Sequence, residues 1–86
     1  SKVYWVDTSI DTADVADTTQ GSVDLGGSVE TFADTPAAQT RADYIAEVTA
    51  GLPALTEYDF VVGTSVLRLS RALTPDEAQA YVDALN

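Results

Sequence analysis

The stretch 58–71 constrains the fold more than any other part of the chain, because its residues alternate in a way that fits one pairing register. Gly63 and Thr64 form a Gly-X pair, which is typical of a two-residue type II′ turn, since glycine takes a positive φ without steric cost. With that turn, one face of the hairpin is largely apolar. Its pairs are Val62 with Ser65, Phe60 with Leu67 and Tyr58 with Leu69.

The opposite face of this hairpin supports the same register. It pairs Val61 with Val66 and Asp59 with Arg68, and the second pair carries opposite charges. A slip of one residue would set Asp59 against Leu67, so both faces specify the pairing. The sequence therefore predicts a β-hairpin closed by Gly63 and Thr64.

A first helix is predicted after position 34. Asp34 or Thr35 can cap its start, and Pro36 suits its first turn. Gly51 suits the left-handed position after its last turn. The apolar residues of this segment advance by three or four positions and so share one helical face. They are Ala38, Ala42, Ile45, Val48 and Leu52.

A second helix is predicted after Thr74, where the sequence Thr-Pro-Asp-Glu forms a capping box. In this motif the Thr74 hydroxyl and the Glu77 carboxylate each accept a hydrogen bond from the other residue's backbone N–H. The residues expected to face the core are Ala78, Tyr81, Val82 and Leu85.

The N-terminal third is less regular. Residues 3–6 are apolar on both alternating faces, which predicts a central strand from Lys2 to Asp7. Residues 8–20 are rich in Asp, Thr and Ser and predict a loop anchored by Ile10 and Val15. A second hairpin is expected over 23–32, with a three-residue loop through Ser28, although a two-residue turn at the two preceding glycines is the alternative.

The sequence thus predicts one domain, 1–86. Its predicted elements follow in the order strand, long loop, hairpin, helix, hairpin, helix. The sequence predicts an α+β fold: a two-layer sandwich in which an antiparallel sheet of about five short strands carries both helices on one face. A small barrel flanked by helices is the alternative.

The charge balance limits the classes of molecule that the chain is expected to bind. The chain has 14 acidic and four basic residues, for a net charge of −10. So few cations argue against binding nucleic acid or anionic membranes, and no run approaches the roughly 18 apolar residues of a membrane span. Many aspartates and a single lysine make the composition resemble that of proteins from salt-loving archaea; an ordinary acidic domain from a GC-rich genome is the other interpretation. Ser1 is compatible with removal of an initiator methionine.

The residue types present also limit the catalytic and metal-binding chemistry that the chain can perform. Without histidine or cysteine, the commonest general base, the common nucleophile pairs and tetrahedral zinc sites are absent, so we expect neither an enzyme nor a cofactor. The only metal candidates are weak, because their spacing does not match a calcium-binding loop and a solvated acidic loop explains them better. These candidates are Asp7, Asp11, Asp14 and Asp17.

Two functional hypotheses remain. The first is a non-enzymatic structural or protein–protein interaction module, a subunit of a larger assembly of the virion or surface-layer type, acting through a protein partner or through self-assembly. Tyr44 and Tyr81, expected at helix edges, are its candidate interaction residues. The alternative is an acidic inhibitor or nucleic-acid mimic that occupies a basic site on a partner enzyme. The sequence does not fix the localisation.

Overall fold

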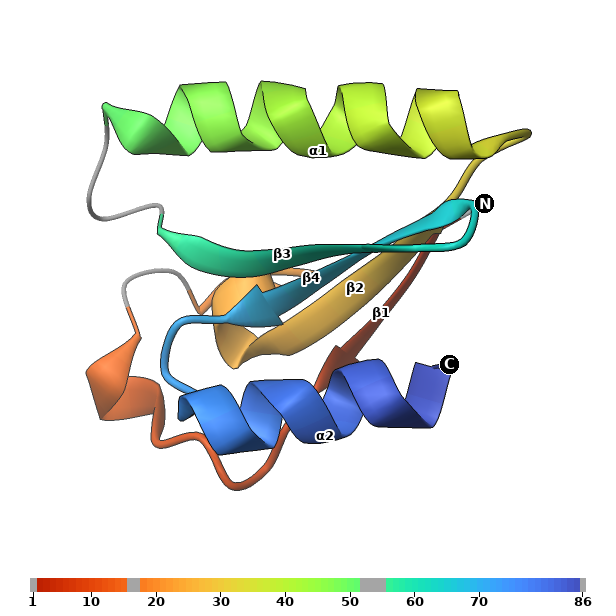
Figure 1. The fold of residues 1–86 in the computed structure, drawn as a ribbon. Helices are drawn as coiled ribbons and strands as arrows, with labels where there is room; N and C mark the ends of the chain where they lie inside the picture. The colour runs from red at the N-terminus through yellow and green to blue at the C-terminus, as the bar shows by residue number, and fades with distance from the viewer. Residues whose placement is uncertain (1, 16–17, 52–55, 86) are drawn as a thin grey trace.

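The structure is a computed structural model that describes residues 2–15, 18–51 and 56–85 (Figure 1). It contains four strands, two α-helices and two short 3₁₀ helices. In chain order these are β1 (Lys2–Val6), η1 (Thr12–Asp14), η2 (Val23–Leu25), β2 (Gly26–Thr31), α1 (Thr35–Ala50), β3 (Glu57–Val62), β4 (Ser65–Ser70) and α2 (Pro75–Leu85).

The strands form one antiparallel sheet with the order β1-β2-β4-β3. The predicted hairpin is confirmed: β3 and β4 pair with Phe60 opposite Leu67 and Asp59 opposite Arg68. Gly63 has a φ of +60°, as the first position of a type II′ turn requires. The helix α1 carries the chain from β2 to the far edge of the sheet, where β3 begins.

The two helices cover opposite faces of the sheet (Figure 1), which corrects the predicted arrangement of both helices on one face. On one face Val66 packs with Ala38, Ala42 and Ile45 of α1. On the other, the core cluster holds Leu67, Leu69, Leu73 and Ala78, with Tyr81 and Val82 of α2 packed against it. The α+β class is confirmed, but the sheet has four strands rather than about five and the architecture has three layers. β4 buries Val66 on one side and Leu67 and Leu69 on the other, so each face of the sheet needs a helix packed against it.

The predicted hairpin over 23–32 is wrong. Residues 23–25 form η2, whose start is capped by Ser22, and the two glycines lie inside β2 rather than in a turn. A Cβ atom on Gly27 would lie 2.6 Å from the Arg68 carbonyl oxygen and 2.7 Å from the Trp5 ring. These glycines therefore let neighbouring strands and an aromatic ring approach the backbone.

The strand β1 lies at an edge of the sheet and not at its centre, which corrects a second prediction. Its apolar side chains are consequently exposed: Val3 at 62%, Tyr4 at 47% and Val6 at 61%. Trp5 is the exception, because its ring turns to the α2 face and stacks on Tyr81 with 5.5 Å between centroids.

The helix ends follow the sequence signals closely. Asp34 accepts a hydrogen bond from the Ala37 N–H at 2.8 Å, and Thr74 and Glu77 form the predicted reciprocal capping box at 3.2 and 2.8 Å. Gly51 has a φ of −92°, so the predicted left-handed conformation at the end of α1 is wrong. Leu52 lies outside the described residues.

Candidate functional site

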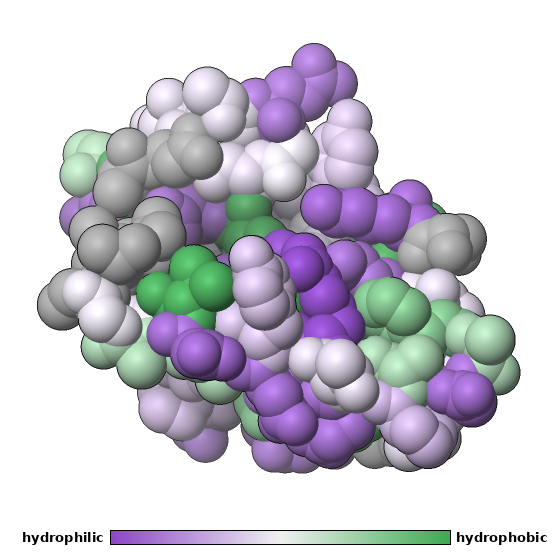
Figure 2. Space-filling model, turned by 90° about the horizontal axis from the view of Figure 1, so that it is seen from above, coloured by the Kyte–Doolittle hydropathy of each residue, from purple (hydrophilic) through white to green (hydrophobic). Residues whose placement is uncertain are grey.

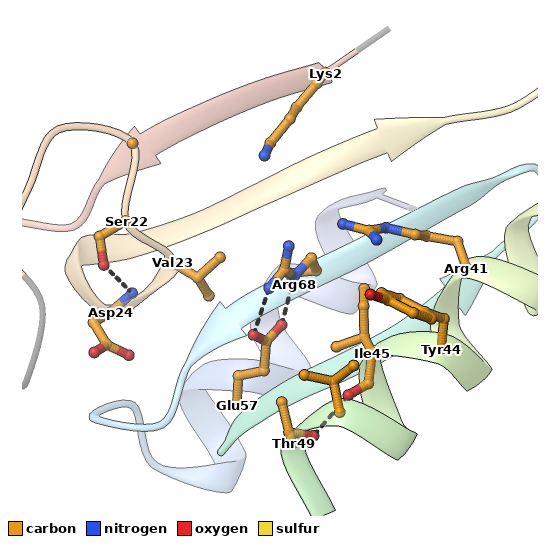
Figure 3. A pocket seen from close by; sticks show the side chains of 12 residues that line it. Lys2, Ser22, Val23, Asp24, Arg41, Tyr44, Ile45, Thr49, Glu57 and Arg68 are labelled. Atoms are coloured by element: carbon orange, nitrogen blue, oxygen red, sulfur yellow. Dashed lines mark hydrogen bonds and ion pairs between the residues drawn. The ribbon is translucent and has the colours of Figure 1, made fainter. Parts of the chain in front are cut away.

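The main pocket lies on the α1 face, between that helix, the sheet and the turn before β2 (Figure 3). Its volume is about 290 Å³. Figure 2 shows this side of the molecule, with hydrophilic residues across the middle of the face and hydrophobic patches beside them. Three of the four basic residues of the chain line this pocket: Lys2, Arg41 and Arg68.

Arg68 is the centre of a charged cluster under the pocket. Its Nε and Nη2 atoms donate to the two carboxylate oxygens of Glu57, both at 2.7 Å. Its Nη1 lies 3.6 Å from Glu30, and its Nε lies 4.0 Å from Asp59. Arg68 thus binds Glu57 firmly and leaves the other two carboxyl groups less compensated, since paired hydrogen bonds to one carboxylate are the strongest arrangement open to a guanidinium.

Asp59 is the most perturbed group of the cluster. Burial, reinforced by its hydrogen bond with Glu57 and by the negative charge of Glu57, raises the pKa of Asp59 to about 8. Its Oδ1 is buried and has no hydrogen-bond partner among the described residues. Burial alone would also raise the pKa of Glu57, but the hydrogen bond and charge of Arg68 outweigh it and hold that pKa below its usual value. Asp59 is therefore mostly protonated at neutral pH.

The other two basic residues keep donors available. Arg41 contacts Glu30 through Nε at 3.1 Å, and its guanidinium lies 5.7 Å from the centre of the Tyr44 ring. Lys2 lies opposite Glu30 in the β1–β2 pairing, but its ammonium group makes no hydrogen bond or ion pair with any residue that the structure describes. The side chains of Lys2 and Arg41 extend from β1 and α1 toward the same space (Figure 3).

Of the predicted acidic metal candidates, the three that the structure describes, Asp7, Asp11 and Asp14, do not form a group that could hold a metal ion. Asp7 accepts hydrogen bonds from the Ser9 N–H, the Ser9 hydroxyl and the Tyr81 hydroxyl, which lower its pKa. Asp11 caps η1, and Asp17 lies outside the described residues. Within the described part of the chain, no group of three or more acidic residues could hold a metal ion.

The two tyrosines named from the sequence differ in their surroundings. Tyr44 is 57% exposed and lines the main pocket. Tyr81 is half-buried: its hydroxyl donates to Asp7 at 2.6 Å, and its ring stacks on Trp5. Tyr81 is thus occupied within the protein, whereas Tyr44 presents its ring to the pocket and to solvent.

A second surface feature is the free edge of β1. On the α2 face it continues into an open apolar depression of about 310 Å³. That depression is lined by Trp5, Val29, Leu67, Tyr81, Ala84 and Leu85. Tyr4 and Val6, exposed on the α1 face, and Val3 with the apolar hollow, on the α2 face, therefore flank the same edge strand.

Sequence reasoning missed both features. It paired Asp59 with Arg68 correctly, but Glu57 lies two residues earlier on the same strand and therefore on the same face, and this spacing could have revealed the competing carboxylate. Nothing in the sequence indicated that Lys2 and Arg41 would meet there, because they come from elements far apart in the chain.

Comparison with protein-family models, with curated protein sequences and with solved structures found no match. Within the described residues, neither helix combines the length and apolar character needed to cross a membrane.

Proposed function

We propose that this protein is a non-enzymatic structural module that assembles with a second copy of itself through the free edge of β1. The observation that carries the proposal is the exposure of Val3, Tyr4 and Val6 on a strand at the edge of the sheet. An exposed apolar edge is a template for strand addition, and proteins that stay monomeric usually protect such edges with charges, proline or bulges.

The charge distribution favours this edge for contact between copies. The chain carries 14 acidic residues, but β1 contains none and begins with Lys2. Two copies with a net charge of −10 each repel, and the repulsion is smallest where the approaching surfaces lack carboxylates. Salt screens the remaining repulsion, so assembly should strengthen with ionic strength.

Two β1 strands can pair antiparallel about a two-fold symmetry axis, in a register that suits the side chains of β1. With the axis at Tyr4, the two Tyr4 rings lie opposite one another, Lys2 faces Val6 of the second copy, and Val3 faces Trp5 of the second copy. No two like charges meet in this register. The result is an isologous interface that joins the two sheets into one.

Sedimentation velocity at low and near-molar sodium chloride tests the proposal. We expect a monomer at low salt and a growing dimer population at high salt. Tyr4→Lys should abolish the dimer, because it puts two like charges at the axis although it makes the net charge less negative. Tyr44→Lys changes the net charge equally at an exposed site on α1 and should dimerise as well as the parent chain.

Two results would overturn the proposal. One is a monomer at every salt concentration. The other is an equal loss of the dimer in Tyr4→Lys and Tyr44→Lys, with both variants folded by circular dichroism.

The acidic-mimic hypothesis needs carboxylates in exposed rows. Three of the carboxylates, those of Glu30, Glu57 and Asp59, are instead mostly buried beside arginines.

A further inference from the structure

The main pocket gathers positive charge in a strongly acidic protein. Lys2, Arg41 and Arg68 come from β1, α1 and β4, and among the basic residues only Arg71 lies away from this pocket. A net charge of −10 makes such a concentration of cations unusual. A local cluster of this kind can attract an anion at short range even when the distant field is negative, because salt screens charges beyond about 8–10 Å.

The hydrogen-bond donors of the three basic side chains differ in how many of them already have an acceptor within the protein. Both strong bonds of Arg68 go to Glu57. Arg41 uses only Nε for a hydrogen bond, and its terminal amino groups make none with the residues described here. The ammonium group of Lys2 likewise has no partner in the described ranges. Two neighbouring side chains therefore retain charged donors that can bind one carboxylate.

The charge count in the cluster leaves room for one further anion. Three cations face Glu30, Glu57 and Asp59, and Asp59 is mostly protonated at neutral pH. Asp24 also lines the pocket, but its carboxylate points away from Lys2 and Arg41 (Figure 3). Near Lys2 and Arg41, positive charge thus exceeds negative charge.

Part of the remaining wall of the pocket is apolar or aromatic, beside the polar Ser22 and Thr49. Tyr44, Ile45 and Val48 of α1 line one side, and Val23 lies across from them. A volume of about 290 Å³ is at the small end for ligand pockets. The lining therefore matches a compact molecule with an anionic end and an apolar body.

We propose that this pocket binds a small organic carboxylate, with Lys2 and the terminal amino groups of Arg41 holding the carboxylate and the α1 wall covering the apolar body. The pocket shares Lys2 with the β1 edge, but Arg41 comes from α1 and is not part of the edge strand, so changes at Arg41 test the pocket separately from the proposed dimer.

Benzoate is the probe, because it combines one carboxylate with a compact ring. The experiment is an NMR titration of backbone amides at constant ionic strength and low protein concentration. We expect saturable shifts at Lys2, Tyr44 and Ile45. Benzamide, which has the same shape without the charge, should bind at least about tenfold more weakly, since it cannot accept charge-assisted hydrogen bonds from Lys2 and Arg41.

Variants locate the site. Arg41→Gln and Lys2→Gln should each weaken benzoate binding by about tenfold or more. Arg71→Gln removes the same charge outside the pocket and should leave binding within about twofold of the parent. Thermal melts confirm that each variant is folded, and Arg41→Gln reports on the pocket without altering β1.

The proposal fails if benzoate gives no saturable shifts, if benzamide binds equally well, or if Arg71→Gln weakens binding as much as Arg41→Gln does. Inorganic phosphate is a second probe in the same titration. If phosphate binds as tightly as benzoate, the pocket is a general anion site, and the assignment to organic carboxylates is overturned.

Discussion

Arg68 and Glu57 form a two-bond ion pair on the α1 face of the sheet, with both N–O distances at 2.7 Å. The residue directly opposite Arg68 in the hairpin is Asp59, yet its carboxylate lies 4.0 Å away. Glu57 has a longer side chain and reaches the guanidinium in the paired geometry that aspartate does not achieve here. This competition explains why Asp59, and not Glu57, carries the raised pKa.

Glu57→Gln should lower the free energy of unfolding by about 1–2 kcal/mol, because it replaces two charge-assisted hydrogen bonds with one weaker one. The loss is limited because Asp59 can then ionise and pair with Arg68. Urea denaturation at about pH 7 measures the change, and Glu47→Gln, at an exposed position of α1, is the control. Equal stability of the two variants would contradict the importance of the Arg68–Glu57 pair.

The contribution of Asp59 to stability should fall as the pH rises from about 4 to about 8. Asp59 has a raised pKa, about 8 against an ordinary 3.8, so the folded state binds its proton more tightly than the unfolded chain does. The corresponding stability is fully present below the ordinary pKa of 3.8 and is lost progressively as the pH rises to about 8. Asp59→Asn mimics the protonated form, so it should match the parent near pH 3 and exceed it near pH 9 by about 1 kcal/mol or more.

Denaturation curves at several pH values test this prediction. Asp43→Asn, at an exposed site on α1, should follow the parent across the range. If Asp59→Asn retained the full pH dependence of the parent, another group would be responsible.

Gly27→Ala should destabilise the protein by about 2 kcal/mol or more, because the new methyl group would clash with the Arg68 carbonyl oxygen and the Trp5 ring, both within 2.7 Å. Gly51→Ala is the control: nothing lies within 4 Å of its Cβ position and its φ is negative, so it should be neutral or slightly stabilising. Thermal melts measure both. An unchanged midpoint for Gly27→Ala would mean that the β1–β2–β4 contact is looser than described.

Thr74→Ala should cost about 1 kcal/mol, because it leaves the Glu77 N–H without the hydroxyl acceptor that now lies 3.2 Å away. The exposed Thr8, whose hydroxyl makes no hydrogen bond with any residue in the described ranges, provides the matched Thr8→Ala control. Urea midpoints of the two variants should separate clearly, and coincident midpoints would show that the cap contributes little.

Added sodium chloride should raise the melting temperature of the monomer. Ten uncompensated negative charges repel more in the compact state than in the unfolded chain, and salt screens that repulsion. The ion pairs of Arg68 are largely buried and lose less to screening. Glu47→Lys makes the net charge less negative by two units at an exposed site, so its melting temperature should depend less on salt. A melting temperature that falls with salt would show that ion pairs outweigh the net charge.

Local signals in the sequence determined the parts of this protein in which near neighbours interact. The Gly63 turn fixed the β3–β4 register, because a period-two pattern admits one alignment in which both faces match. Asp34, Thr74 and Glu77 fixed where the helices begin, since capping involves residues only three positions apart. The α+β class followed from these elements.

The tertiary structure alone decided how the elements are arranged and where the charged residues meet. Trp5 of β1 and the Arg68 backbone of β4 approach Gly27 closely from two sides. Gly26 and Gly27 therefore belong to a strand, although the sequence Gly-Gly is typical of a turn. The edge position of β1 follows from pairing across more than twenty residues, and its apolar composition is equally compatible with a central strand. Lys2, Arg41 and Arg68 converge because three elements distant in sequence enclose one pocket. Contacts of this kind depend on how strands are ordered and which face each helix covers, and no local pattern in the sequence encodes that order.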